Sequence, residues 1–553
     1  MNISHLKVLI SIILLGLGGD FLKAQQPVPE PIRPVKPNVI LLLADSLGWQ
    51  DVKCYDIDKP SAMETPNIDA LAKKGVLFWQ AYAAAPTSSP SRCAIMSGIH
   101  PARAQRTHVL GGIPAVPYNR ELHRMMPPWH SGRMLENDLA LASVLNHNGY
   151  MTGHAGKWHM GNDGRPRPGY DHWVAYDGHG RLRDPRLNEN GTYVQHTGYV
   201  TDIITDLSLD WLAKRDKTKP FVLMCQHKAP HREWEPNIKD LGFDKDRVYP
   251  EPPTLFDDYA NRAKAVGEND MTLEKTITPK DVKLVRPPQL DVEQAAVWDA
   301  YYEPRNAAYQ KANLSGKDLV RWRYQRYMHD YLATVKAVDD NIGRVLKYLE
   351  AEGLAENTIV IYSSDQGFYL GEHGWFDKRW IFEESVRTPL LVRWPGVTKP
   401  GSVSKALVSN VDYAQTFLDM AGLPSPAEMQ GRSLKPILAG ETPADWRKEF
   451  YYHYYEYPQP HHVAPHYGII TDRYKLVRYY GNGETKTDLF DSEKDPLELK
   501  SFFGQPGYES VQADLEARLA KLRTDLKVPE VEDEYASGAK KRAGVNQVPA
   551  KNA

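Results

Sequence analysis

The chain contains several uninterrupted apolar runs that are long enough to form strands. They are Asn38–Ala44, Phe221–Met224, Thr358–Tyr362 and Pro389–Val392. Strands that are covered on both faces have continuous apolar runs, whereas strands with one wet face alternate apolar and polar residues. These four segments are therefore predicted to be central strands of a sheet.

Segments with helical spacing of apolar residues lie between these runs. They are Ile68–Lys74, Leu139–Asn146, Val200–Lys214 and a long segment with the approximate bounds Leu319–Glu352. Strands that alternate with helices indicate a mostly parallel sheet. Residues 232–316 are charged and contain prolines, so we expect them to form a long irregular excursion near the active face.

The pattern changes beyond residue 440. Phe450–Tyr455 and Tyr474–Tyr480 resemble antiparallel strands, and Val511–Leu526 resembles one amphipathic helix. The sequence thus predicts an α/β fold with a large, mostly parallel or mixed sheet flanked by helices. A smaller C-terminal α+β subdomain is expected to carry an antiparallel sheet. The predicted boundaries are 38–440 for a catalytic domain, 441–530 for the subdomain and 531–553 for a polar tail.

The N-terminal segment has the layout of a signal peptide. Lys7 precedes the apolar run Val8–Leu15, and Ala24 follows as a plausible cleavage point. The run is too short to span a membrane. We expect a signal peptide at 1–24, a Pro-rich linker at 25–37, and a periplasmic or secreted protein of bacterial type without stable membrane insertion. The formal charge of −2 gives no basic field for nucleic acid.

Polar, reactive residues follow three of the predicted strands. Asp45-Ser46 follows the first, Gln226 to His231 follows the second, and Asp365-Gln366 follows the third. In open α/β sheets, sites form outside the carboxyl ends of the strands. One such strand end is an ordinary transition to a loop, but three of them together predict a single site.

The pentapeptide Ser88-Ser89-Pro90-Ser91-Arg92 permits two interpretations. Serine and proline often begin helices, so on its own it could be a simple helix start. However, the segment also resembles the signature of type I sulfatases, in the alkaline phosphatase superfamily. In that family a Cys or Ser followed by x-Pro-Ser-Arg is oxidised to formylglycine, and Ser88 occupies that position.

The resemblance covers most of residues 38–400. Its further motifs are Thr65 to Gly75, Gly149 to Thr152 with Gly156 to His159, Asp365 to Gly367 with Lys378, and Asp488 to Glu498. Two positions depart from the family pattern. Ser46 stands where a second Asp is usual, and Gln366 stands where Asn or His is common. These departures leave open whether Ser46 binds a metal directly or through a water.

The resemblance implies a role for each candidate residue. One Ca²⁺ ion is expected on oxygen ligands from Asp45, Asp365, Gln366 and the modified Ser88. Arg92, Lys157 and Lys378 would supply positive charge to a sulfate, and His159 and His231 would donate hydrogen bonds or protons. In the implied mechanism a hydroxyl of the hydrated formylglycine attacks sulfur, His231 protonates the leaving alcohol, and the second hydroxyl allows sulfate to leave.

The implied substrate is a sulfated oligosaccharide or polysaccharide, such as ulvan or a glycosaminoglycan. A formylglycine-generating maturation enzyme is the implied partner. Two alternatives stay open at this point: a phosphoester hydrolase of the same superfamily that uses unmodified Ser88, and a non-catalytic protein that binds sulfated glycans. His179, Arg183 and Arg232 lie in loops that either contact sugar or carry ordinary surface charge.

Overall fold

A computed structural model describes residues 36–56, 63–104, 141–161, 163–457, 460–480 and 486–528. The predicted signal peptide, most of the predicted linker and the predicted polar tail lie outside these residues. In the described part of the chain, no helix combines the length and the apolar character needed to cross a bilayer.

A ten-stranded mixed sheet forms the centre of the catalytic region. Its strands lie in the order β12 (Ser402–Ser409), β2 (Val76–Tyr82), β11 (Leu390–Arg393), β8 (Thr358–Ser364), β1 (Asn38–Ala44), β7 (Phe221–Gln226), β3 (Met151–Gly156), β4 (His172–Ala175), β5 (Arg186–Glu189) and β6 (Thr192–Gln195). The central run from β8 to β4 is parallel, while β11, β5 and β6 pair antiparallel to their neighbours. All seven residues of β1 are buried, as its continuous apolar run predicts.

Helices cover both faces of this sheet. One face packs against α1 (Pro66–Lys74), α4 (Val200–Lys214) and the 36-residue α7 (Gly316–Ala351). The other face packs against α2 (Ser88–Ser97), α3 (Leu141–His147), α9 (Tyr413–Met420) and α10 (Lys435–Leu438). Alternate residues of β1 enter the two cores, with Ile40 and Leu42 on one side and Leu41 and Leu43 on the other.

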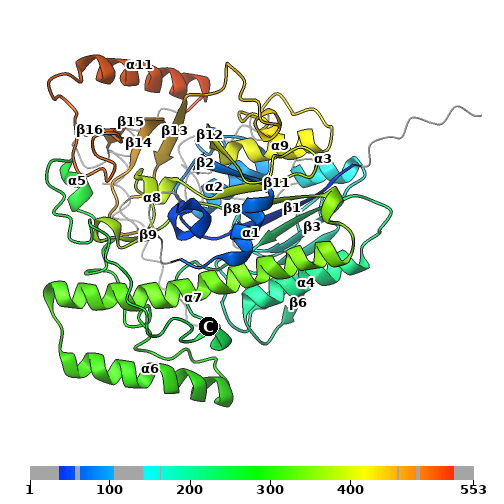
Figure 1. Ribbon diagram of the computed structural model, residues 1–553, viewed down its shortest axis with the longest axis horizontal. Coiled ribbons are helices and arrows are strands. Elements are labelled where there is room, and N and C mark those ends of the chain that lie inside the picture. The colour runs from blue at the N-terminus through cyan, green and yellow to red at the C-terminus, as the bar shows by residue number, and fades with distance from the viewer. Residues whose placement is uncertain are drawn as a thin grey trace, which may run out of the picture. The chain divides into compact units, whose positions relative to one another are not determined.

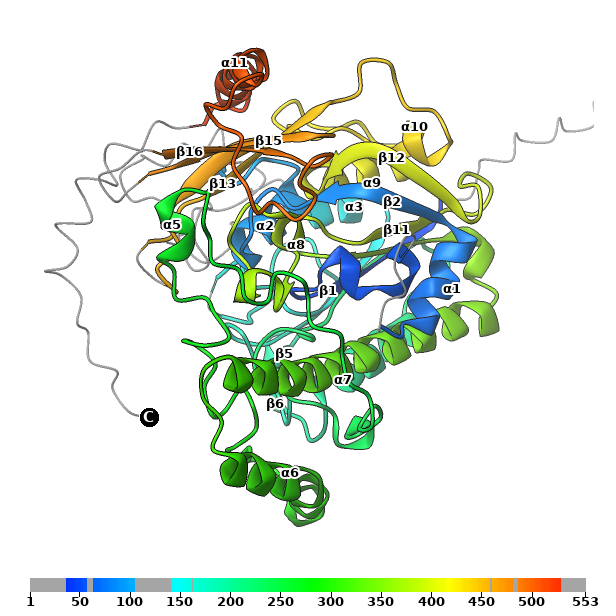
Figure 2. The same ribbon diagram turned by 60° about the vertical axis from the view of Figure 1, so that its left-hand side comes forward.

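The segment 232–316 is more regular than the sequence suggests. It contains the short α5 (Lys264–Gly267) and the 21-residue α6 (Val292–Ala312). Figures 1 and 2 show α6 on the far side of α7 from the sheet. Tyr302 of α6 donates a hydrogen bond to Asp330 of α7 at 2.6 Å. The expectation of an irregular excursion was therefore wrong for this helix.

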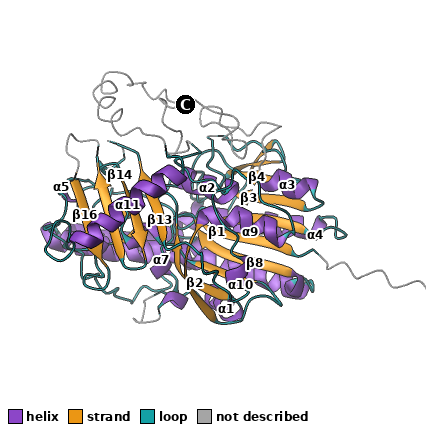
Figure 3. Cartoon of the chain, turned by 90° about the horizontal axis from the view of Figure 1, so that it is seen from above, coloured by secondary structure: helices purple, strands orange, loops and turns teal. Residues whose placement is uncertain are grey.

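The C-terminal region forms a separate antiparallel sheet. Its order is β13 (Glu449–Tyr454), β14 (His466–Thr471), β15 (Tyr474–Tyr479) and β16 (Lys486–Asp491), with α11 (Glu509–Asp525) packed against it. Figure 3 shows this sheet beside the large one, and β13 contacts β12. The strands β9 (Tyr369–Leu370) and β10 (Phe376–Asp377) form a separate two-stranded sheet. The short α8 (Glu383–Val386) follows β10 along the chain. The predicted fold class is confirmed.

Candidate active site

Four neighbouring parallel strands deliver polar side chains to one edge of the sheet. Asp45 follows β1, Gln226 ends β7, Asp365 follows β8 and Lys157 follows β3. Because the strands are parallel and adjacent, their carboxyl ends lie together. The sequence predicted this convergence for three strand ends, and the structure adds the fourth from β3.

Ser88 reaches this edge from the start of α2. The helix follows β2, and every one of its residues is buried. The backbone N–H groups in the first turn of a helix favour negative charge, so this position suits an anionic ester. The helix ends at Gly98, whose φ of 64° lies in the left-handed region that glycine adopts readily.

The Ser88 hydroxyl lies between two carboxylates. Its oxygen is 2.8 Å from Asp365 Oδ2 and 3.1 Å from Asp45 Oδ1. Lys157 Nζ donates a hydrogen bond to the same oxygen at 3.2 Å, and it also pairs with Asp45 Oδ2. Any group attached at the Ser88 side chain would therefore meet two acids and one cation.

Arg92 donates hydrogen bonds to residues at the ends of three strands. Its Nε donates to Asp365 Oδ2 at 3.0 Å, and its Nη1 donates to the backbone oxygen of Lys157 at 2.9 Å and to Gln226 Oε1. The side chain is fully buried. Arg92 thus links the helix that carries Ser88 to the ends of β8, β3 and β7.

Lys378 and Gln366 reach the site through Ser46. The Ser46 hydroxyl accepts a hydrogen bond from Lys378 Nζ at 3.0 Å and another from Gln366 Nε2 at 2.6 Å. The backbone N–H of Ser46 donates to Asp365 Oδ1 at 3.0 Å. Gln366 Oε1 is buried and has no hydrogen-bond partner among the described residues.

Burial and charge set the protonation of this cluster. Burial raises the pKa of Asp45, but Lys157 and the other nearby cations overcome it and hold that pKa well below its usual value. The pKa of Asp365 is raised by burial and by the neighbouring Asp45 carboxylate. Burial lowers the pKa of Lys157 to about 7, although Asp45 opposes the change. Two buried acids that face each other favour a bound cation.

His159 and His231 flank the cluster and are joined by His179. The His179 ring centroid is 4.2 Å from that of His159 and 5.0 Å from that of His231. His231 Nδ1 donates to the backbone oxygen of Arg232 at 2.8 Å, which leaves Nε2 for other contacts. The pKa of His231 is held well below its usual value, first by burial and then by Lys378. Sequence reasoning placed His179 only in a loop.

Other residues that the sequence singled out lie elsewhere or are paired. His227 is buried between β7 and α4, where its Nε2 lies 3.0 Å from Thr205 Oγ1. Arg183 pairs with Glu235, and Arg232 pairs with Asp281 at 2.5 Å. These two arginines therefore stabilise the loops that carry them.

A polar cluster next to Lys378 was missed by sequence reasoning. Arg379 Nη1 donates to Asp377 Oδ2 at 2.5 Å, and His461 Nε2 lies 3.2 Å from the same oxygen. Asp377 and Arg379 are 7% and 6% exposed. The signal in the sequence was their position on either side of Lys378.

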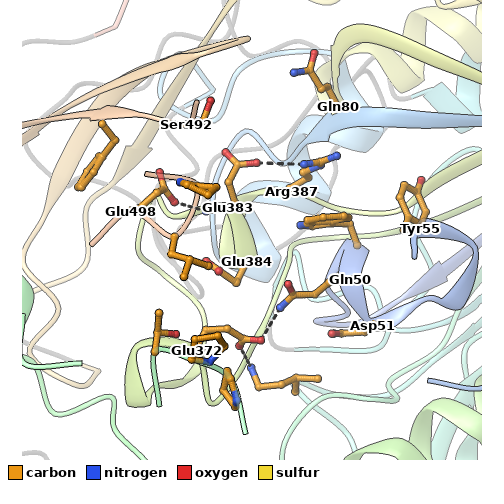
Figure 4. A pocket seen from close by; sticks show the side chains of 18 of the residues that line it. Gln50, Asp51, Tyr55, Gln80, Glu372, Glu383, Glu384, Arg387, Ser492 and Glu498 are labelled. Carbon is orange, nitrogen blue, oxygen red and sulfur yellow. Dashed lines mark hydrogen bonds and ion pairs between the residues drawn. The ribbon is translucent and has the colours of Figure 1, made fainter. Parts of the chain in front are cut away.

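A cavity of about 860 Å³ lies between the catalytic region and the C-terminal sheet. Figure 4 shows Gln50 pointing toward Glu372 and Glu383 pointing toward Arg387 across this space. Ser88, Asp45 and Asp365 do not line it. The cavity is rich in acidic side chains, which would repel an anionic ester, so the Ser88 cluster is the candidate active site.

The Ser88 cluster lies at the carboxyl edge of the sheet, and buried cations surround a side chain suited to nucleophilic attack. These features are typical of hydrolases that act on anionic esters. Comparison with known families narrows the class. Residues 37–423 match the sulfatase family, and residues 371–525 match the family described as N-sulphoglucosamine sulphohydrolase, C-terminal. The chain belongs to the sulfatase family and is a sulfuric ester hydrolase.

Two relatives and one solved structure match most of the chain. The N-acetylglucosamine-6-O-sulfatase of Bacteroides thetaiotaomicron is 40% identical over 520 residues, which cover 90% of this chain and 88% of that protein. The ulvan-active sulfatase of Formosa agariphila is 25% identical over 92% of this chain and 84% of that protein. The solved structure of BT4656 in complex with its substrate D-glucosamine-2-N,6-O-disulfate has a TM-score of 0.83 and 40% identity, and covers 90% of this chain and 99% of that one. The predicted family and enzyme class are confirmed.

Proposed function

We propose that this sulfatase removes the 6-O-sulfate from glucosamine residues of a sulfated glycan, with Ser88 as the residue that becomes formylglycine. The relatives of 40% identity act on or bind sulfated glucosamine, which supports the substrate class. The assignment of Ser88 as the reacting residue is carried by the position of its Oγ between Asp45, Asp365 and Lys157.

The residues at the site fit one Ca²⁺ ion. Asp45 and Asp365 offer carboxylate oxygens, Ser88 lies between them, and Gln366 Oε1 is a buried acceptor without a partner in the described part of the chain. Calcium prefers such oxygen ligands. No three His, Cys, Asp or Glu side chains group as a metal site among the described residues, so the proposed ligand set depends on amide and hydroxyl oxygens as well. A bound calcium ion would stabilise negative charge on the sulfate.

Formylglycine, when hydrated, supplies a nucleophilic hydroxyl and a second hydroxyl on the same carbon that permits release of sulfate. The residues of the chain prepare this position. Lys157 donates to the oxygen at Ser88 and balances Asp45, while Arg92 fixes Asp365. Fixed positive charge of this kind stabilises the anionic transition state more than it would in water.

His231 is proposed to protonate the leaving alcohol. Its Nδ1–H is committed to the Arg232 carbonyl, so Nε2 is the atom that faces substrate. Burial and, after it, the nearby cations hold the pKa of His231 well below its usual value. An anionic sulfate beside these cations offsets them and favours the protonated ring, which then donates its Nε2 proton to the sugar oxygen. His159 is proposed to bind sulfate oxygens through its buried Nε2, which lacks a partner in the described residues.

The cluster of Asp377, Arg379 and His461 is proposed to bind sugar hydroxyls next to the scissile sulfate. Both acceptor and donor groups are present, and they are held rigidly by one another. Charged groups give stronger hydrogen bonds to hydroxyls than neutral groups do. Export to the periplasm or outside the cell, and modification by a formylglycine-generating enzyme, remain part of the proposal.

A desulfation screen tests the proposed function. The matured enzyme should release sulfate from glucosamine 6-sulfate and should leave the 2-N-sulfate of the 2-N,6-O-disulfate intact. Ser88→Ala protein prepared in parallel should release none. Faster release from ulvan oligosaccharides or from a 2-O-sulfated uronate would contradict the substrate assignment. Release of phosphate by protein with unmodified Ser88, without sulfate release, would favour the phosphoester alternative.

A further inference from the structure

The two positions that depart from the sulfatase pattern contact each other. Ser46 and Gln366 are far apart in the sequence, yet Gln366 Nε2 donates to Ser46 Oγ at 2.6 Å, and both side chains are fully buried. We propose that they work as one unit, in which Ser46 is a positioning residue that turns Gln366 Oε1 toward calcium and is not itself a ligand. This inference depends on the calcium site of the proposed function.

The hydrogen bonds of Ser46 leave it no oxygen lone pair for a metal. A hydroxyl has one donor and two acceptor positions. The Ser46 oxygen accepts from Gln366 Nε2 and from Lys378 Nζ, and it lies 3.4 Å from Asp45 Oδ1, to which it donates. All three positions are used. Direct metal binding would require the loss of one of these contacts.

The same contacts determine which end of the Gln366 amide faces the site. The Ser46 hydroxyl directs its proton to Asp45 Oδ1 and accepts from the Lys378 ammonium. The position that it leaves for Gln366 is an acceptor, so the amide group that fits beside it is a donor. The NH₂ end therefore points to Ser46, and Oε1 points away. Oε1 is buried and has no partner among the described residues. A buried acceptor without a partner is unfavourable, and a calcium ion would satisfy it.

The lengths of the two side chains suit this contact. Serine is shorter than aspartate, so it brings no carboxylate to the site. Glutamine is one methylene longer than asparagine, and this extra length lets its amide contact Ser46 and still present an oxygen. The site then carries the two carboxylates of Asp45 and Asp365 and a neutral amide oxygen. The amide is thus held in place by residues that do not bind the metal.

Calcium titration of the full chain after treatment with chelator tests the unit. Ser46→Gly removes the hydroxyl and suits the backbone, because residue 46 has a φ of 66°. We expect Ser46→Gly, which removes the group that orients the amide, to weaken calcium binding about 10–100-fold. Gln366→Asn shortens the proposed ligand itself and should weaken calcium binding at least as much. The double variant should bind calcium no more weakly than the single variant that has the lower calcium affinity. Ser46→Asp with Gln366→Asn, which restores the usual family pair, should recover most of the affinity.

Ser208→Ala is the matched control, since it removes a buried hydroxyl that donates to Ile204 in α4, away from the site. It should bind calcium like the unaltered chain. Melting temperatures in chelator identify variants that fail to fold. If Ser46→Gly fails to fold, the comparison of Gln366→Asn with the Ser46→Asp, Gln366→Asn pair carries the test. Additive losses in the double variant, or unchanged affinity in Ser46→Gly, would overturn the inference. Failure of the unaltered chain to bind calcium would instead overturn the calcium site of the proposed function.

Discussion

Arg92→Lys tests the network that organises the candidate site. The substitution keeps the positive charge but replaces a planar fork of donors by a single ammonium. In the structure, Arg92 Nε donates a hydrogen bond to Asp365, and Nη1 donates to the Lys157 carbonyl and to Gln226 Oε1. A lysine that keeps the Asp365 contact cannot reach the other two acceptors.

The expected loss of stability follows from leaving those two acceptors without a donor. Both acceptors are buried, because Lys157 and Gln226 are 0% and 1% exposed. An unsatisfied buried acceptor costs about 1–3 kcal/mol. The free energy of unfolding should therefore fall by about 2–6 kcal/mol in the variant.

Denaturant unfolding, followed by tryptophan fluorescence, measures this loss. Arg344→Lys provides the control, because Arg344 pairs with Asp206 at the surface, where the two side chains are 41% and 60% exposed. That pair should contribute no more than about 1 kcal/mol. If Arg92→Lys and Arg344→Lys unfold at the same denaturant concentration, the structural role assigned to the Arg92 fork is wrong.

Three further predictions concern the subdomain contact, acid stability and proton donation. Lys475→Met should lower the free energy of unfolding by about 3 kcal/mol, because it removes the cation that lies 2.6 Å from Glu498 and 3.1 Å from Glu383; equal melting temperatures would contradict this. Burial lowers the pKa of His100 to about 4, so the neutral ring stabilises the fold fully above pH 6.5 and this stabilisation is lost as pH falls toward 4. His100→Gln should therefore reduce the loss of unfolding free energy between pH 7 and pH 4 by about 3 kcal/mol. The same loss in the variant and in the unaltered chain would refute this. His231→Ala should reduce the turnover of a sugar sulfate about 10²–10⁴-fold and that of a nitrophenyl sulfate much less, since the phenolate leaves without a proton; equal losses on both substrates would argue against a proton-donating role.

Four neighbouring strands near the centre of the ten-stranded sheet, β11, β8, β1 and β7, could be predicted because they are largely buried on both faces. The run at β1 has the predicted bounds, and β7 and β8 each extend only two residues further. The helix α6 was missed for the opposite reason. Only Trp298 and Tyr302 of its 21 residues are buried, so it lacks the broad apolar face that marks a helix in sequence. Its contact with α7 is made by few side chains.

The candidate site could be predicted where its residues follow strands. Asp45 and Asp365 meet because β1 and β8 are parallel neighbours with Ala44 opposite Ser364. The role of His179 could not be predicted, because it follows β4 after a loop and its contact with two other histidines depends on tertiary packing. The pairing of Ser46 with Gln366 was also hidden. Each residue on its own is a departure from a pattern, and only their distance shows that they belong together.

The mass of the peptide that contains Ser88 tests the central claim most directly. The full chain is produced with and without a formylglycine-generating enzyme, digested and compared by mass spectrometry, and sulfate release is measured on the same samples. We predict a peptide that is two hydrogens lighter only after maturation, with sulfate release in proportion to its amount. Sulfate release by protein whose Ser88 peptide keeps its full mass would contradict the claim.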